Sequence, residues 1–235
     1  MKALYMTNSY LKEFSAVVKQ IESNNILLDE TAFYPQGGGQ PCDFGSMSAD
    51  GKSYSVVNVF KKDGAIWHEV SGPGLKEGDR VDCRIDWERR YRLMRMHTAA
   101  HVINSIFYKE ASALITGNQL GIDKSRIDFS LDVIDREKIQ AYIEKANHIV
   151  QEALGVKIYF LKKDEAMKIE GIVKLAAAMP PDVEELRIVE IPGVDLQADG
   201  GTQVENTKEI GKIVLLSLEN KGKNNRRMYY TLEES

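Results

Sequence analysis

The amino-acid sequence predicts an α+β protein, in which a small N-terminal antiparallel β-barrel precedes a domain with helices packed on an antiparallel sheet. Up to about residue 86, short stretches that alternate apolar and polar residues are separated by turn residues. From residue 87 the apolar spacing becomes that of a helix, and the rest of the chain mixes both patterns. A length of 235 residues fits two modest domains, which we place at 1–86 and 87–235.

Three stretches predict the strands of the barrel. Residues 16–31, "AVVKQIESNNILLDET", alternate around a turn signal at Asn24-Asn25, and residues 53–70 alternate around Asp63-Gly64. A third stretch, "GDRVDCRID", follows another glycine. Short strands joined by tight turns favour a small antiparallel barrel.

A helix opens the second domain. It begins at Trp87 with Asp86 as its N-cap, and its apolar positions continue to Phe107. A second, amphipathic helix is predicted within 135–154. The remaining predicted elements are strands over 156–163 and 186–191, a short helix within 163–169, and a closing hairpin formed by 209–222 and 226–233.

The composition is that of an ordinary globular protein, with 43% hydrophobic and 28% charged residues. The chain has no apolar run long enough to span a bilayer and no signal-peptide pattern, so we expect a cytoplasmic protein without a membrane partner. Cys42 and Cys83 are isolated from any C-x-x-C pattern, which disfavours a zinc ribbon and, in a reducing compartment, a disulfide.

The net charge of −4 argues against a protein that wraps around DNA, because that binding neutralises phosphates with Lys and Arg. Two basic stretches, "RIDWERRYRLMR" and "NKGKNNRRMYY", nevertheless provide local patches for a phosphate backbone. Their alternative interpretation is a solvated helix face and a polar turn. The residues that we assign to nucleic-acid binding are Arg89, Arg92, Lys221, Lys223, Arg226 and Arg227.

Two segments of the second domain carry metal-binding chemistry. His97 and His101 are four residues apart on the predicted helix, so both imidazoles can reach one ion, although such pairs are often core residues. Thr98 follows His97 where a metalloprotease would have glutamate, which disfavours that reaction. The second segment is polar and surrounds a glycine pair, with a strand, turn and strand as the alternative interpretation; its polar residues are Asp195, Gln197, Asp199, Thr202 and Gln203.

The order of these segments resembles the editing domain of alanyl-tRNA synthetase and its free-standing relatives, the AlaX trans-editing proteins. The resemblance covers nearly the whole chain, including "TAFYPQGGGQPCDFG", which is similar to the glycine-rich segment of the medium-length members. It implies metal-dependent hydrolysis of the ester that joins a wrong amino acid to tRNA-Ala, with serine, or glycine in some relatives, as the amino acid removed. The partner that it implies is tRNA-Ala carrying the wrong amino acid.

The resemblance also implies one zinc ion per chain. His97 and His101 match the family's helical histidines, whereas Asp199 stands at the position of the family's Cys and Gln203 at that of its loop His. A carboxylate is a competent zinc ligand, and an amide oxygen is a poor one. We predict His97, His101, Asp199 and Gln203 as ligands, and we place Thr202 with the two histidines in the catalytic machinery.

A site that removes serine needs polar groups for the serine hydroxyl. The candidates are polar residues after the histidine helix and in the glycine-pair loop, for which a polar turn is the alternative; they are Thr116, Asn118, Gln119, Gly200, Gly201 and Thr202. The resemblance adds Gly37, Gly38, Gly39 and Gln40, which otherwise form a tight barrel turn. His68 and His148 are taken as structural or surface residues.

Two other functions fit the same sequence. The H-x-x-x-H helix also resembles the editing domain of threonyl-tRNA synthetase, so a deacylase with another aminoacyl specificity is the first alternative. The second is a tRNA-binding module that has lost its metal, which Gln203 in place of a histidine suggests. The oligomeric state is left open.

Overall fold

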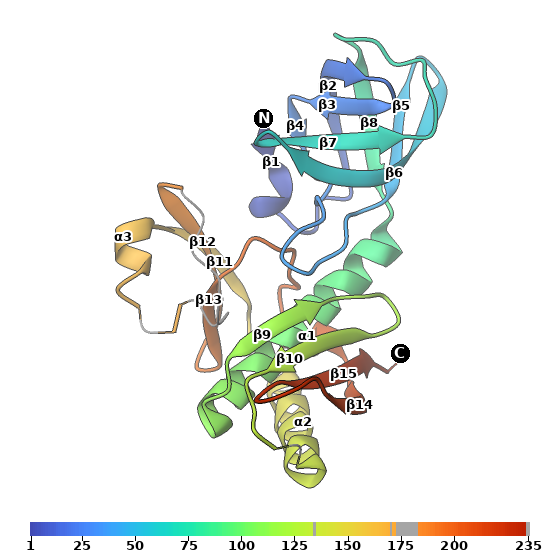
Figure 1. Ribbon diagram of the computed structural model, residues 1–235. Helices are drawn as coiled ribbons and strands as arrows, with labels where there is room; N and C mark the ends of the chain where they lie inside the picture. Colours follow the sequence, from blue (N-terminus) through green and yellow to red (C-terminus); the bar gives the residue numbers. More distant parts are fainter. Residues whose placement is uncertain (134, 170, 173–182, 234–235) are drawn as a thin grey trace. The chain divides into compact units, whose positions relative to one another are not determined.

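The computed structural model describes residues 1–133, 135–169, 171–172 and 183–233. The chain divides into two compact units, Met1–Leu93 and Met94–Ser235, which are described separately. Helix α1 (Trp87–Ala111) begins in the first unit and continues into the second (Figure 1). The Asp86 carboxylate accepts a hydrogen bond from the Arg89 amide at 3.2 Å, as expected of the N-cap of this helix. Among the described residues, no helix is both long and apolar enough to cross a membrane.

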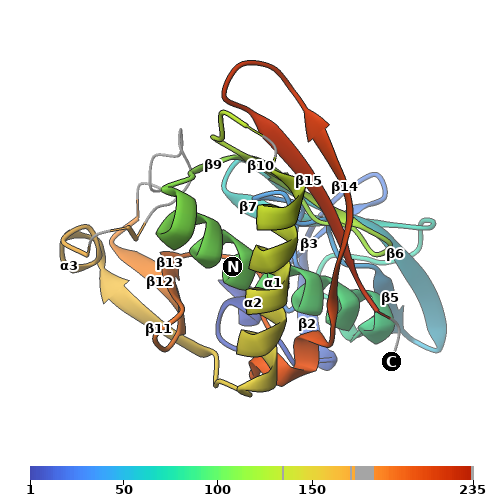
Figure 2. The same cartoon turned by 90° about the horizontal axis from the view of Figure 1, so that it is seen from below.

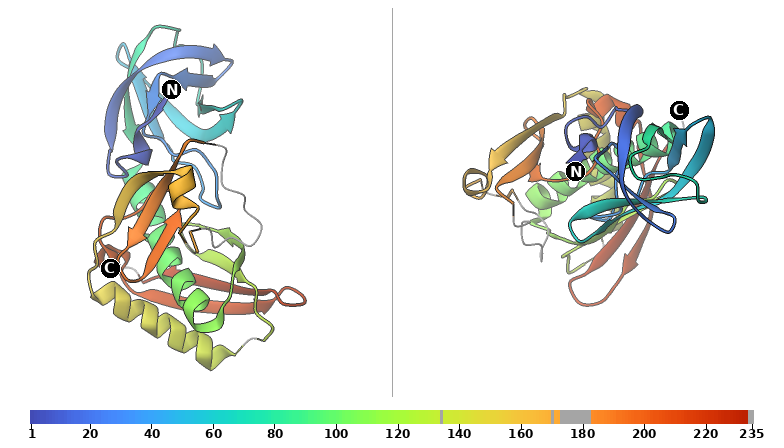
Figure 3. Two further views of the ribbon diagram at one scale, coloured as in Figure 1. Left: turned by 90° about the vertical axis from the view of Figure 1, so that its left-hand side faces the viewer. Right: turned by 90° about the horizontal axis from the view of Figure 1, so that it is seen from above.

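The first unit contains the predicted antiparallel barrel, which is closed by six strands in the order β2-β3-β7-β6-β5-β8 (Figure 3). A short parallel pair, β1 with β4, lies outside the barrel and is joined to it by the 3-10 helix η1. The bounds are β1 Lys2–Ala3, η1 Leu4–Met6, β2 Glu13–Glu22, β3 Asn25–Leu28, β4 Glu30–Thr31, β5 Gly45–Ala49, β6 Lys52–Lys62, β7 Ala65–Val70 and β8 Arg80–Ile85.

Two-residue turns set the register of the barrel hairpins. Asp63 and Gly64 both have positive φ, 52° and 77°, and join β6 to β7 as predicted. The β2–β3 turn lies at Ser23-Asn24, one residue earlier than expected, since Glu22 pairs with Asn25. Strand β5 has no counterpart in our sequence analysis, because its sequence "GSMSA" contains a single large apolar residue, the buried Met47.

A buried ion pair fastens the start of α1 to the barrel unit. The Arg90 side chain is fully buried and donates to both carboxylate oxygens of Asp43, at 2.9 and 3.0 Å from Nε. It also donates to the carbonyl oxygens of Ser9 at 2.8 Å and Ala32 at 2.6 Å. Asp43 in turn accepts from the Tyr34 amide. This network binds the first turn of α1 to the barrel unit.

His68 is a structural residue of the barrel. Its ring is fully buried, with Nε2 2.8 Å from the Thr31 hydroxyl and Nδ1 3.0 Å from the Ile26 carbonyl oxygen. Burial lowers the pKa of His68 to about 4, so the ring is neutral at physiological pH. Its role is therefore to fix β4 and β7 against each other, as the sequence analysis supposed.

The second unit confirms the predicted α+β class, and its antiparallel strands form two sheets. One has the order β14-β15-β10-β9 and the other β11-β12-β13. Helices α1 and α2 lie on one face of the four-stranded sheet (Figure 2). The bounds are β9 Ile115–Gln119, β10 Ser125–Phe129, α2 Arg136–Gln151, β11 Lys157–Lys162, α3 Lys163–Ala166, β12 Glu185–Ile191, β13 Asp195–Ala198, the 3-10 helix η2 Thr207–Ile210, β14 Ile213–Asn220 and β15 Arg226–Leu232.

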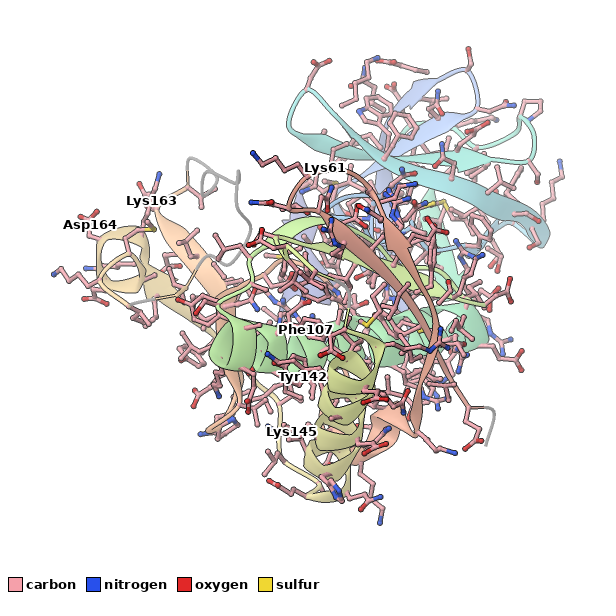
Figure 4. All side chains as sticks on the ribbon, turned by 60° about the horizontal axis from the view of Figure 1, so that its bottom comes forward. Lys61, Phe107, Tyr142, Lys145, Lys163 and Asp164 are labelled. Carbon is pink, nitrogen blue, oxygen red and sulfur yellow. The ribbon has the colours of Figure 1, made fainter. Side chains whose placement is uncertain are left out.

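Aromatic contacts join the helices of this unit to the four-stranded sheet. The Phe107 ring of α1 stacks on Phe129 of β10 with centroids 4.1 Å apart, and it meets the edge of Tyr142 of α2 (Figure 4). The buried Tyr230 hydroxyl of β15 donates to the Met96 carbonyl oxygen at 2.8 Å. These contacts hold the middle of α1 in place, and the middle of α1 carries the two histidines.

We predict that Arg90→Met lowers the free energy of unfolding by about 3–5 kcal/mol, because the Asp43 carboxylate would stay buried without its charged partner. The matched control is Arg84→Met, which removes a barrel arginine that is 77% exposed and 3.6 Å from Glu13. That pair should contribute less than about 1 kcal/mol. Denaturant unfolding measures both, and equal losses in the two variants would contradict the assigned role of Arg90.

Candidate metal centre

The two helical histidines face each other within the second unit. His97 and His101 are one turn apart on α1, and their ring centroids are 5.1 Å apart. Their exposed fractions are 6% and 4%, so both imidazoles are almost removed from water. A buried imidazole needs partners for its ring nitrogens, and these come from the segment that surrounds the glycine pair.

Asp199, in the loop after β13, completes a cluster with the two histidines. Its Oδ2 is 3.4 Å from His97 Nε2, and its Oδ1 is 3.9 Å from His101 Nε2. One potential ligand atom from each residue lies within 4.8 Å of the other two. Imidazole nitrogens and a carboxylate oxygen are ligands for divalent transition metals. The cluster can therefore hold a metal ion.

Asp195 orients His101 from the side opposite to the cluster. His101 Nδ1 donates to the buried Asp195 carboxylate at 2.8 Å, which leaves the lone pair of Nε2 directed toward Asp199. Gln197, on the same face of β13, donates from Nε2 to both Asp195 oxygens, at 3.0 and 3.3 Å. A carboxylate behind an imidazole is the usual outer partner of a metal-ligating histidine, because it fixes the tautomer and the ring orientation.

Gln203 presents its amide nitrogen, not its oxygen, to the cluster. Nε2 is 3.2 Å from His101 Nε2 and donates to Asp199 Oδ1 at 3.1 Å, while Oε1 accepts from the Thr98 hydroxyl at 2.7 Å. Thr98 itself accepts from the Val204 amide, so its proton is available for Gln203. An amide nitrogen is not a metal ligand, so Gln203 would bind an ion only after its amide turns over, and its role as a ligand stays a prediction.

The Asp199 carboxylate stays ionised in this environment. Burial alone would raise its pKa, but the neighbouring His97, His101 and Arg187 lower the pKa of Asp199 well below its usual range. Arg187 of β12 is buried and donates to the Asp199 carbonyl oxygen at 2.7 Å. The Gly201 amide donates to Asp199 Oδ1 at 2.8 Å. The carboxylate is thus held in one position before any cation binds.

The glycine pair and Thr202 have different environments. Gly200 is exposed, and a Cβ atom added to it would meet nothing within 4 Å. Gly201 is buried and contributes its amide to Asp199, while Thr202 is fully buried. Within this loop, Gly201 contacts the cluster directly, through its amide. The catalytic role of Thr202 stays a prediction.

The candidates for the serine pocket on β9 do not share one face of the sheet. Asn118 pairs with Ile127 and Gly117 with Asp128, whereas Gln119 pairs with Arg126. Asn118 therefore lies on the helix-covered face with the buried Ile127, and Gln119 points to the opposite face. Thr116 is exposed and donates to Asn225 Oδ1 at 3.1 Å. Asn118 is the candidate that this register directs toward α1.

The glycine loop of the first unit is a tight turn in which two of the glycines have positive φ. Gly38 and Gly39 have φ of 58° and 85°, a region that favours glycine, whereas Gly37 does not. Gly37 and Gln40 exchange backbone hydrogen bonds at 2.9 and 3.1 Å, and Gln40 is 1% exposed. A structural reason for two of the three glycines is thus present, and a role for the loop in substrate selection stays a proposal.

The predicted RNA-binding residues differ in how many contacts their side chains make within the protein. Arg89 stacks over the Phe44 ring, Arg92 is half-buried on α1, and Lys221 and Lys223 are exposed. Arg226 donates to Asn220, Gly222 and Asn225 and contacts the Asp132 carbonyl oxygen. Arg227 donates to both oxygens of Asp128, at 2.7 and 2.9 Å. Arg226 and Arg227 therefore have structural roles in the β14–β15 hairpin.

Sequence reasoning missed the residues that position the cluster. Arg187 lies in the strand "ELRIVEI", and an arginine within an apolar strand was the available signal. Asp195 and Gln197 alternate on β13 and were recognised as polar, but their position behind His101 depends on how β13 packs near α1. Thr98 gave no signal beyond excluding a metalloprotease motif.

Two family models match the chain. Residues 2–89 match the family described as tRNA synthetases class II (A), and residues 186–229 match the family described as threonyl and alanyl tRNA synthetase second additional domain. The second match contains Arg187, Asp195, Asp199 and Gln203 of the candidate metal centre.

The chain has relatives that match it along nearly its whole length. The alanyl-tRNA editing proteins AlaX-M of Methanosarcina barkeri and Saccharolobus solfataricus are 48% and 46% identical to it, over 98% of both chains in each case. An alanine–tRNA ligase of Methanococcus aeolicus is 36% identical over 97% of this chain, which corresponds to 25% of the ligase. With nearly half of its residues identical over the full length of these editing proteins, the chain belongs to the AlaX-M family of alanyl-tRNA editing proteins.

Proposed function

We propose that this protein is a trans-editing hydrolase that deacylates mischarged tRNA-Ala, most of all Ser-tRNA-Ala. The observation that carries the proposal is the cluster of His97, His101 and Asp199 in a chain of the AlaX-M family. The substrate would be an ester, which is already activated compared with an amide. The site then needs to position water, polarise one carbonyl group and exclude the correctly charged tRNA.

One zinc ion per chain is the proposed cofactor, held by His97, His101 and Asp199. Three protein ligands suit a catalytic rather than a structural zinc site, because they leave a coordination position for substrate or water. The ion would act as a Lewis acid toward the ester and its attacking water. Asp195 would keep His101 in the tautomer that this requires, and Gln203 would act as a positioning residue beside the ligands.

Serine is the favoured amino acid because its hydroxyl distinguishes it from alanine. A pocket built to hydrogen-bond a hydroxyl leaves its own polar groups unpaired when alanine enters. Asn118 faces α1 on the covered side of β9, and Thr202 lies beside Gly201, so these two are the first candidates for that role. Glycine, or another aminoacyl group, is the competing specificity.

A metal-free tRNA-binding module is the second candidate function. The amide group of Gln203 donates to the same atoms, His101 Nε2 and Asp199 Oδ1, whose lone pairs an ion would need. Two measurements separate the candidates: the metal content of the purified protein, and deacylation rates with Ser-, Gly- and Ala-tRNA-Ala. The editing proposal expects bound metal and fastest release of serine, whereas the module would release none of the three.

The first site prediction concerns His97. His97→Ala should abolish metal binding and deacylation together, since two ligands form too weak a site. His148→Ala is the matched control, because His148 is exposed on α2 and remote from the cluster in sequence. Metal per chain is measured by elemental analysis. Full zinc occupancy in His97→Ala would show that His97 is not a zinc ligand.

The second concerns Gln203. Gln203→His should bind zinc more tightly than the wild-type protein, because it replaces an amide with an imidazole, a much better ligand. Gln203→Leu separates ligation from mere removal of the amide group. Competition with a coloured chelator gives the affinities. Flat or weaker binding in the histidine variant would mean that residue 203 does not reach the ion.

The third site prediction tests the glycine loop at Gly37, the glycine of the three whose backbone conformation suits a side chain. A Cβ atom on Gly37 would meet only Pro35 and Tyr34 oxygens at 3.9 Å, so Gly37→Ala should alter stability by less than about 0.5 kcal/mol. If the loop selects the amino acid, the ratio of Ser- to Ala-tRNA-Ala deacylation should change. Gly72→Ala, unstrained and open, is the control. An unchanged ratio of the two deacylation rates in both variants would mean that the loop has only a structural role.

A further inference from the structure

The four-stranded sheet of the second unit has one face turned away from α1 and α2. Ile127, Met228 and Tyr230 are almost fully buried on the helix side, and residues between them in sequence must point outward. Pairing places those residues in two rows across the strands. One row is Glu219, Arg227, Asp128 and Gly117, and the other is Ser217, Tyr229, Arg126 and Gln119. We call this surface the outer face.

The rows of the outer face carry two arginines and two carboxylates, but the two arginines differ in how closely a carboxylate pairs with them. Arg227 uses both Nε and Nη2 on the two oxygens of Asp128, at 2.7 and 2.9 Å. Arg126 shares the same carboxylate at a longer distance, 3.9 Å from Nη1 to Oδ2. At the rim, Lys221 is 3.5 Å from Glu219. One carboxylate thus serves two arginines at the centre of the face.

Arg126 is the arginine with capacity for another anion. Its Nε atom is buried and has no hydrogen-bond partner among the described residues, although the side chain as a whole is 30% exposed. Its nearest carboxylate, Asp128, is 3.9 Å away and is already paired with Arg227, so the charge of Arg126 is the less neutralised of the two and its exposed part can meet an anion.

An aromatic ring and a lysine adjoin this arginine. Tyr229 pairs directly with Arg126 in the sheet, and its ring is half-exposed. The exposed Lys124 lies over that ring, with Nζ 5.1 Å from the centroid. Gln119, exposed on the other side of Arg126, adds a polar amide. Basic, aromatic and amide side chains on one sheet surface suit the phosphates, bases and sugars of RNA.

We propose that the outer face, centred on Arg126 with Lys124 and Tyr229, binds the phosphate backbone of the tRNA substrate. The inference rests on the proposed function, and it moves the expected contact from the hairpin turn to the sheet. In the turn, the Arg226 guanidinium already donates hydrogen bonds to Asn220 and Gly222 of the hairpin. The outer face instead offers positive charge that the protein only partly neutralises, on a chain whose net charge is −4.

The test is equilibrium binding of uncharged tRNA to the full-length protein over a range of salt concentrations. Arg126→Gln should weaken binding several-fold and make the slope of log affinity against log salt shallower by about one, because one phosphate contact is lost. Arg126→Lys keeps the charge and should retain most of the slope. Arg80→Gln, which removes an exposed arginine of the barrel outside both basic stretches, should leave both quantities unchanged.

The outcomes separate this proposal from the proposed function. His97→Ala should bind uncharged tRNA like the wild-type protein, so loss of deacylation does not imply loss of the outer face. A wild-type slope in Arg126→Gln, with melting showing that the variant is folded, overturns the proposal whatever the deacylase activity is. Equal losses in Arg126→Gln and Arg80→Gln overturn it too, because they indicate a general effect of net charge. A wild-type protein that binds tRNA through Arg126 but hydrolyses no mischarged tRNA refutes the editing function alone.

Discussion

The candidate metal centre depends on one partly buried carboxylate that meets two imidazoles from a single helix turn. His97 and His101 are fixed by α1, whereas Asp199 comes from a loop and needs support. The Gly201 amide donates to that carboxylate, and Arg187 donates to the backbone carbonyl oxygen of the same residue. The charges of His97, His101 and Arg187 lower the pKa of Asp199, so its carboxylate is ionised. Because desolvating an unpaired carboxylate is expensive, the surrounding hydrogen bonds are a condition of the site rather than an addition to it.

Helix α1 links this site to a second buried charge network. Its first turns carry Arg90, whose guanidinium joins Asp43 and two carbonyl oxygens within the barrel unit. Asp43 closes the segment that contains the glycine loop, and it accepts from the Tyr34 amide at the other end of that segment. One helix therefore carries Arg90, which binds the segment of the glycine loop, near its start, and the two histidines of the cluster further along.

The sequence predicted the barrel, α1, α2 and the closing hairpin, because each has a strong local pattern: alternation around turns, helical periodicity or a cap. Strand β5 was missed because its residues are small and polar, and the split into two sheets depends on long-range pairing that no local pattern records. His97 and His101 could be paired from their spacing alone. The orientation of the Gln203 amide could not be predicted, because it depends on the Thr98 hydroxyl, 105 residues away in the chain.

The most direct test of the central claim is a zinc titration of chelator-treated protein, in which bound metal and the rate of Ser-tRNA-Ala hydrolysis are followed in the same samples. If His97, His101 and Asp199 hold the ion that activates the ester, the rate should rise in proportion to occupancy and level off at one zinc ion per chain. Full activity in the metal-free protein, or occupancy without any gain in rate, would contradict the account.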